Sequence, residues 1–203
     1  WHGHYYVKED QHLPGYLPND EIWEIDATYE DQNLPAILLE KEVENQPTES
    51  YFTKTDIVTG EPVEGAKLQI LDEEGTVVRE WITTKEEHLE YALPAGNYFL
   101  HEELPPLEDG YVSAEDVSFE VKEDGTITKV EMQDDFSKVD ISKTDITGDT
   151  ELVGVKLQVL NSKEEVLDEW ISDGTEHRIE YLPVGEELTL RETQTISGYT
   201  LAE

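Results

Sequence analysis

Hydrophobic and polar residues alternate along much of this chain with a period of two. The segments 66–70 (AKLQI) and 117–121 (VSFEV) show the pattern clearly. A period of two places successive side chains on opposite faces of a β-strand. Turn-forming sequences, such as those ending at Gly75 and Gly125, separate these segments at short intervals. The pattern predicts an all-β fold, in which short antiparallel strands form a sandwich with one solvated face.

One long segment occurs twice. Residues 52–71, FTKTDIVTGEPVEGAKLQIL, are matched by residues 141–160, ISKTDITGDTELVGVKLQVL. The offset is 89 residues (143 − 54), and it persists through a Glu-Trp-Ile motif and a Leu-Pro motif further along. Such self-similarity indicates tandem copies of one structural unit.

The order of the repeated motifs divides the chain into three parts. Residues 1–47 resemble the C-terminal part of a unit, with residues 37–45 as its closing strand. Residues 48–136 form one complete unit, and residues 137–203 form the N-terminal part of a third unit that lacks its closing strand. No Gly/Ser-rich or Pro-rich linker separates the parts, so we expect a monomeric rod of directly joined domains. Exchange of closing strands between neighbouring chains is an additional hypothesis.

Composition narrows the classes of function. The chain carries 49 acidic and 14 basic residues, for a formal net charge of −35. This charge repels phosphate backbones and anionic lipids, so we expect no binding to nucleic acid and no insertion into a membrane. The sequence has no cysteine and no apolar run long enough to span a bilayer. Its histidines lack metal-ligand spacing and its serines lack a nucleophile-elbow motif, so we expect no metal, no cofactor and no enzymatic action on other molecules.

Three polar residues of the complete unit fall on the apolar faces of their strands, namely Lys54, Glu102 and Asp134. Lys54 shares its face with Phe52, and Asp134 shares its face with Met132. Burial of each group alone is costly, so the three should meet in one place. One interpretation is a buried salt bridge, or a strand-end residue whose charged tip reaches water. The other is a chemical reaction between the three groups.

An apolar pocket favours a neutral amine and a neutral carboxylic acid. Lys54 could then attack the Asp134 carboxyl group while Glu102 relays protons, which would form an isopeptide bond with loss of water. The incomplete parts carry some of the matching positions, which are Glu9 and Asn45 in the first part and Lys143 and Glu192 in the third. Because each of these parts lacks a partner within the sequence, we expect Asn45 and Lys143 to be unreacted.

Several motifs recur in order over essentially the whole chain: Lys-Thr-Asp, Gly-Ala/Val-Lys-Leu, Leu-Pro-x-Gly, Leu-x-Glu and Gly-Tyr. This pattern resembles the CnaB-type, or SpaA-like, domains of Gram-positive surface adhesins and sortase-assembled pilins. The resemblance implies tandem prealbumin-like, Ig-like β-sandwiches. It also implies an intramolecular isopeptide bond between a lysine on the first strand and an asparagine or aspartate on the last, promoted by a glutamate. Carried over by motif, these residues are Lys54, Asp134 and Glu102.

The resemblance favours a structural stalk or pilin-shaft segment on a bacterial cell surface, anchored to the cell wall through other parts of the parent chain. Its partners would be neighbouring domains of the same chain, and its only catalysis would be the formation of its own bond. The alternative is an adhesin module that binds a host protein or glycan directly. The candidate contact residues for that alternative are aromatic, namely Tyr5, Tyr16, Trp23 and Tyr29.

Overall fold

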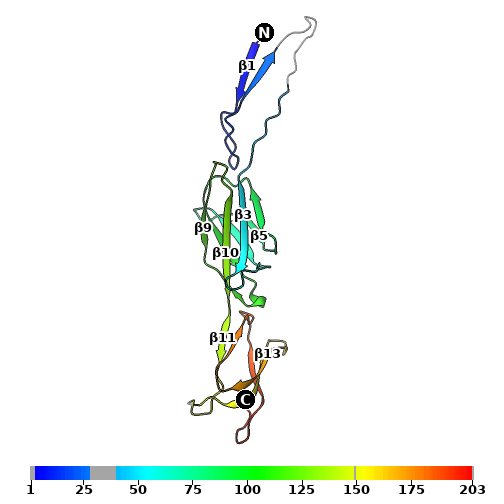
Figure 1. Cartoon of the computed structure of the whole chain (residues 1–203), viewed down its shortest axis with the longest axis vertical. Coiled ribbons are helices and arrows are strands. Elements are labelled where there is room, and N and C mark those ends of the chain that lie inside the picture. Colours follow the sequence, from blue (N-terminus) through cyan, green and yellow to red (C-terminus); the bar gives the residue numbers. More distant parts are fainter. Residues whose placement is uncertain (1–2, 28–39, 149, 203) are drawn as a thin grey trace.

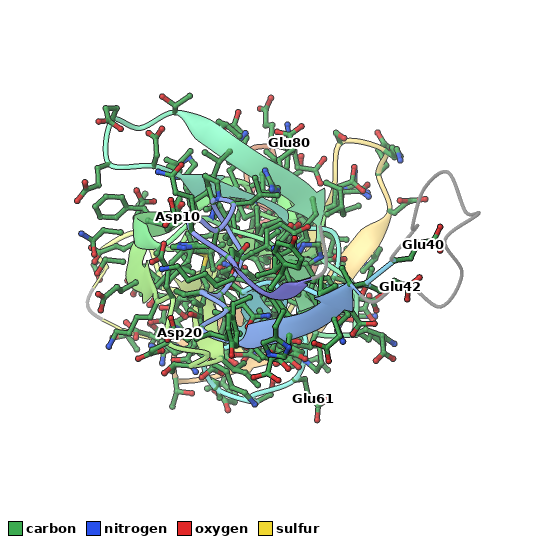
Figure 2. The ribbon with its side chains drawn as sticks, turned by 90° about the horizontal axis from the view of Figure 1, so that it is seen from above. Asp10, Asp20, Glu40, Glu42, Glu61 and Glu80 are labelled. Atoms are coloured by element: carbon green, nitrogen blue, oxygen red, sulfur yellow. The ribbon has the colours of Figure 1, made fainter. Side chains whose placement is uncertain are left out.

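The computed structural model describes residues 3–27, 40–148 and 150–202. These residues form an elongated rod with a hairpin at the N-terminal end, a β-sandwich in the middle and a smaller sandwich at the opposite end (Figure 1). Figure 2 shows the labelled carboxylates of Glu40, Glu42, Glu61 and Glu80 projecting away from the rod. Most of the acidic residues that the structure describes are therefore exposed, and Asp56, Glu102 and Asp134 are the buried exceptions.

The N-terminal hairpin consists of β1 (Gly3–Lys8) and β2 (Ile22–Ala27), which pair antiparallel. The expected closing strand at residues 37–45 does not form in the part that the structure describes, because residues 40–46 are in no strand. Residues 37–39 lie outside the described ranges. A strand needs a partner for its backbone N–H and C=O groups, and residues 40–46 have no paired strand beside them among the described residues.

The middle sandwich contains two four-stranded sheets, ordered β6-β3-β10-β8 and β5-β4-β7-β9. Its elements are β3 (Glu49–Asp56), β4 (Lys67–Leu71), β5 (Val77–Ile82), β6 (His88–Tyr91), β7 (Gly96–Leu104), the 3-10 turn η1 (Leu107–Asp109), β8 (Tyr111–Val112), β9 (Val117–Val121) and β10 (Thr128–Phe136). The sheets are antiparallel except for β3 and β10, which are parallel neighbours. The predicted antiparallel sandwich is therefore confirmed, with this one parallel pair as an exception. The chain enters along β3 and leaves along β10 in the same direction, which makes the pairing parallel (Figure 1).

The core of the middle sandwich lies between its two sheets. On β3 and β10, buried residues alternate with partly or fully exposed ones, as the sequence predicts. The buried apolar residues are Phe52, Ala66, Leu68, Ile70, Leu93, Tyr98, Leu100, Val121, Val130 and Met132. The same inward faces also carry the polar residues Lys54, Glu102 and Asp134. The core thus brings these three groups into a place that water does not reach.

The C-terminal sandwich repeats part of this plan. Its strands are β11 (Lys138–Ile141), β12 (Val153–Leu160), β13 (Val166–Asp173), β14 (His177–Glu180) and β15 (Thr189–Gln194). They form a three-stranded sheet, β13-β12-β15, and a two-stranded sheet, β11-β14. The stacked rings of Trp170 and His177, with centroids 4.3 Å apart, match the Trp81–His88 stack of the middle sandwich at 4.0 Å. Among the described residues, no strand pairs with β11 as β10 pairs with β3.

Candidate cross-link site

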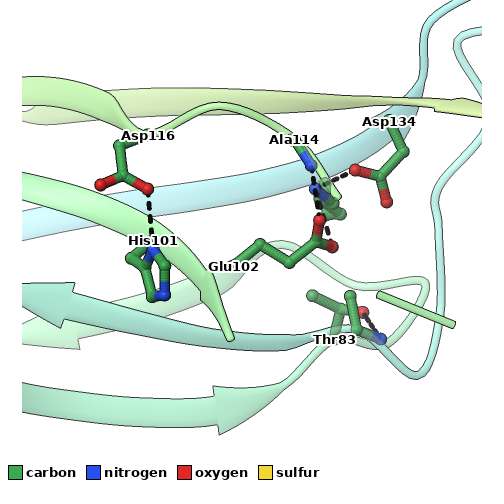
Figure 3. A network of polar contacts seen from close by, with 8 residues as sticks. Thr83, His101, Glu102, Ala114, Asp116 and Asp134 are labelled. Atoms are coloured by element: carbon green, nitrogen blue, oxygen red, sulfur yellow. Dashed lines mark hydrogen bonds and ion pairs between the residues drawn. The ribbon is translucent and has the colours of Figure 1, made fainter. Parts of the chain in front are cut away.

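Three strands position the candidate site of the middle sandwich. Lys54 lies on β3 and Asp134 on the neighbouring strand β10, where Lys54 is opposite Met132 and Asp56 is opposite Asp134. Glu102 lies on β7 of the facing sheet. Figure 3 shows the side chains of Glu102 and Asp134 pointing toward one another next to the backbone of Ala114. The structure therefore brings all three sequence-predicted residues together.

The contacts are close and fully enclosed. Lys54 Nζ lies 3.0 Å from Glu102 Oε1 and is in direct contact with Asp134 Oδ1. The exposed fraction of each of the three side chains is 0%. Although the groups are within ion-pair distance, Lys54 Nζ, Glu102 Oε1 and both carboxylate oxygens of Asp134 make no well-aligned hydrogen bond. A buried salt bridge must offset the desolvation of its charges, and the side chains of this site have no exposed surface.

The electrostatics of the site favour a neutral carboxylic acid. The pKa of Asp134 is raised to about 7, because burial and the charge on Glu102 raise it more than the adjacent Lys54 amine lowers it. Near neutral pH a substantial fraction of Asp134 is therefore protonated. A protonated carboxyl group is a better electrophile than a carboxylate, because a neutral hydroxyl can accept a further proton and leave as water.

A backbone amide fixes the glutamate. The Ala114 N–H donates a hydrogen bond to Glu102 Oε2 at 2.8 Å, which leaves Oε1 facing Lys54. Sequence reasoning missed this contact, since a backbone donor in a loop carries no side-chain signature. A cavity of about 140 Å³ also borders Lys54, and its lining includes Phe52, Trp81 and His88. This cavity is large enough to receive a water molecule from the site.

The matching positions of the N-terminal part also meet. Asn45 Nδ2 donates a hydrogen bond to Glu9 Oε1 at 3.0 Å. Asn45 Oδ1 is buried with no hydrogen-bond partner among the residues that the structure describes. A glutamate and the amide at the position that matches Asp134 are thus in contact here.

The C-terminal sandwich brings together the other pair of groups. Lys143 Nζ lies 3.1 Å from Glu192 Oε2, with 22% of the lysine side chain and 2% of the glutamate side chain exposed. Burial alone would raise the pKa of Glu192, but Lys143 and the N–H of Ala202 lower it overall. A groove of about 560 Å³ runs beside Lys143 and Glu192. In the middle sandwich, β10 occupies the corresponding place beside β3.

The aromatic residues of the adhesin hypothesis differ in their exposure to solvent. Trp23 is buried, whereas Tyr5 is 47% exposed on the hairpin. Tyr16 is half-buried and forms an isolated bridge with Pro47, and Tyr29 lies outside the described residues.

Other kinds of site were also sought in the described part of the chain. There, no group of three or more His, Asp or Glu side chains is placed to hold a metal ion. Within the same residues, no helix is long and apolar enough to cross a membrane.

Comparison with known proteins identifies related domains. The family model of the SpaA domain, described as a prealbumin-like fold domain, matches residues 49–135 and 137–203. Among solved structures, the Bacillus anthracis TIE protein is 28% identical with a TM-score of 0.57, and the match covers 100% of this chain and 38% of that protein. This chain therefore spans well under half of the TIE protein.

Two pilins show more distant similarity. The Streptococcal ancillary pilin is 20% identical with a TM-score of 0.46, over 99% of this chain and 69% of that one. The shaft pilin SpaA from Lactobacillus rhamnosus GG is 14% identical with a TM-score of 0.38, over 77% of this chain and 91% of that one. No curated protein matches this sequence.

Proposed function

Because this chain belongs to the SpaA family of prealbumin-like domains, we propose that it is a stalk or pilin-shaft segment of an extracellular bacterial surface protein. In this proposal an isopeptide bond between Lys54 and Asp134 stabilises the middle sandwich, and Glu102 relays the protons. The observation that carries the proposal is the contact of these three side chains in a core where none of them is exposed.

The proposed reaction is a condensation. The neutral Lys54 amine attacks the carboxyl carbon of protonated Asp134, and a C–N bond forms. Glu102 accepts a proton from the amine and passes it to the hydroxyl of the tetrahedral intermediate, so that the C–O bond breaks and water leaves. The 3.0 Å distance from Glu102 Oε1 to Lys54 Nζ suits the transfer, and the adjoining cavity offers a place for the released water.

Burial supports the proposal at two stages. It raises the pKa of Asp134 and so supplies the neutral acid that the reaction needs. It also keeps bulk water away from the product, because the atoms of the site have no exposed surface. The same enclosure that makes three polar groups costly as ions therefore favours their conversion into an amide.

The position of the bond fits a load-bearing role. It would join β3, where the chain enters the sandwich, to β10, where the chain leaves, and these strands are direct neighbours. Tension along the rod would then pass through the cross-link and leave the other strands unloaded. The bond would close a loop of 80 residues (134 − 54). On the chain-entropy account of cross-links, closing such a loop stabilises the unit by roughly 4 kcal/mol. Such a bond needs no cysteine, so it would form without the oxidising compartment that a disulfide requires.

Intact mass spectrometry of the purified chain tests the proposal. We expect a mass lower than that of the sequence by one water, and we expect Lys54→Ala and Glu102→Ala to restore the full mass. Lys67→Ala is the matched control, because Lys67 forms a surface ion pair with Glu80 at 3.0 Å and should leave the deficit unchanged. A full mass for the unaltered chain would show that the three groups form only a salt bridge.

A further inference from the structure

The hairpin part and the middle sandwich meet at a joint that centres on Thr48. Its N–H donates to the Gly15 carbonyl at 2.9 Å, and its own carbonyl accepts from the Ala92 N–H at 3.0 Å. The Thr48 hydroxyl donates to the Leu93 carbonyl at 2.6 Å. Thr48 is only 4% exposed. Thr48 thus links the Gly-Tyr element of the preceding part (Gly15-Tyr16, matched by Gly110-Tyr111) to the Leu-Pro turn of the next unit (Leu93-Pro94, matched by Leu182-Pro183).

The middle and C-terminal sandwiches meet through the same hydrogen bonds, 89 residues later (137 − 48). The Ser137 N–H donates to the Gly110 carbonyl at 2.8 Å, and the Ser137 carbonyl accepts from the Tyr181 N–H at 3.1 Å. The Ser137 hydroxyl donates to the Leu182 carbonyl at 2.7 Å. Three donor–acceptor pairs therefore recur at both joints, although hydroxyl-bearing residues of different types make them.

The glycine of each Gly-Tyr element is required by close approach of the next unit. A Cβ added to Gly15 would lie 2.2 Å from the Ala92 carbonyl oxygen, and one added to Gly110 would lie 2.4 Å from the Tyr181 carbonyl carbon. Both glycines have a positive φ, at +83° and +82°. Ala92 and Tyr181 also share an unusual backbone conformation, each with φ of 58°, which side-chain-bearing residues adopt only when surrounding contacts hold them there.

We propose that the Gly-Tyr element is a docking site for the Leu-Pro turn of the following SpaA unit, and that Thr48 and Ser137 are the latches that fix the angle between units. The partner is the next unit of the same chain. The joint contains no flexible linker, and its hydrogen bonds constrain the backbone on both sides. Consecutive units therefore keep one relative orientation, whether or not the isopeptide bond forms within a unit.

The second joint, between the middle and C-terminal sandwiches, has additional contacts made by Tyr181. The Tyr181 hydroxyl donates a hydrogen bond to Asp56 Oδ2 at 2.8 Å, and Asp56 is only 2% exposed at the end of β3. The Tyr181 ring stacks on Phe136 with centroids 3.9 Å apart. Ala92 stands at the matching position of the first joint and has neither a hydroxyl nor a ring. The second joint should therefore be the more rigid of the two.

Distance measurements between spin labels test the joint directly. The chain has no cysteine, so Lys85→Cys in the middle sandwich and Gln194→Cys in the C-terminal sandwich, both exposed, provide unique labelling sites. Pulsed electron-spin resonance should give one narrow distance distribution for the labelled chain. Gly110→Ala should abolish that single narrow distribution, because its Cβ would collide with the Tyr181 backbone.

The matched control is Gly75→Ala. Gly75 also has a positive φ, at +79°, but nothing lies within 4 Å of an added Cβ, so local strain arises without any contact between units. Its distance distribution should stay narrow. Ser137→Ala provides a second probe that keeps the backbone allowed and removes only the hydroxyl bond to Leu182; it should broaden the distribution less than Gly110→Ala. Unchanged distributions for both joint variants, or equal broadening by Gly75→Ala, would overturn the proposal.

Discussion

The middle and C-terminal sandwiches present the same lysine–glutamate pair in two different surroundings. The Nζ–Oε distances are nearly equal, at 3.0 Å for Lys54 and Glu102 and 3.1 Å for Lys143 and Glu192. Lys54 is fully enclosed, however, whereas Lys143 is 22% exposed beside an open groove. The same pair therefore forms with Lys54 inside β3 and with Lys143 two residues past the end of β11. What differs is β10, which carries the buried Asp134 carboxyl group and pairs with β3 beside Lys54.

The acidic groups respond to these surroundings in opposite directions. Burial raises the pKa of Asp134, and one neighbouring amine does not offset that effect. Glu192 is also shielded, but Lys143 and a backbone N–H lower its pKa. A paired carboxylate therefore stays ionised in the open unit, whereas the closed unit favours the neutral acid. In the proposed reaction, closure by the last strand would be the step that makes the ion pair reactive.

Removing the lysine from each pair should give the largest difference in stability between the two sandwiches. Lys54→Ala should lower the free energy of unfolding of the middle sandwich by roughly 4 kcal/mol, the contribution expected from a cross-link closing a loop of this length. Lys143→Ala should cost the C-terminal sandwich no more than about 1 kcal/mol, as for a partly exposed ion pair. Urea titrations followed by NMR signals of each unit would measure both. Equal losses in the two units would contradict the proposed bond.

The pH dependence of unfolding should also differ between the units when the bond is absent. In Lys54→Ala, Asp134 remains buried and its pKa should stay above the unfolded value of 3.8. The folded state then binds more protons than the unfolded state, so the middle sandwich should lose stability as the pH rises above about 4 toward neutrality. Glu192 has a lowered pKa, so its contribution is present above the unfolded value of 4.5 and is lost as the pH falls through the folded pKa.

Denaturation midpoints of each unit across this pH range would measure the two trends. The unaltered chain provides the control, since an amide at Asp134 does not titrate and should remove the trend from the middle sandwich alone. A middle sandwich of Lys54→Ala that gains stability with rising pH would contradict the assigned direction for Asp134.

Several features of this comparison could be predicted from the sequence. Period two placed Lys54, Glu102 and Asp134 on inward faces, and the structure confirms that they are buried. The chemical roles of the three residues stay predictions. The parallel pairing of β3 with β10 could not be predicted from local patterns, because strand direction depends on how the chain as a whole crosses the sandwich. At residues 40–45 the predicted strand is absent. An alternating pattern forms a strand only where a partner supplies hydrogen bonds.

The acceptor residue offers a more subtle test that leaves stability nearly unchanged. Asp134→Asn would place in the middle sandwich the amide that the hairpin part carries at Asn45. An asparagine acceptor loses ammonia where an aspartate loses water, so the two cross-linked products have the same atoms. The intact masses of Asp134→Asn and the unaltered chain should therefore be identical. Unreacted chains would differ in mass, because an amide replaces an acid, and that difference would show that the bond had not formed.

The smallest expected effect concerns the hydrogen bond from Tyr181 of the C-terminal sandwich to Asp56 of the middle sandwich. Burial and the neighbouring Asp56 raise the pKa of Tyr181 to about 12, so its hydroxyl remains a donor at neutral pH. Tyr181→Phe keeps the stacking on Phe136 and removes one hydrogen bond, which should cost about 1 kcal/mol. The loss should appear as a lower free energy of unfolding of the C-terminal sandwich. The deficit of one water in the intact mass should be unchanged. Tyr91→Phe, at an exposed tyrosine of the middle sandwich, is the control. If Tyr181→Phe destabilised neither unit, the incomplete sandwich would be holding its fold without help from its neighbour.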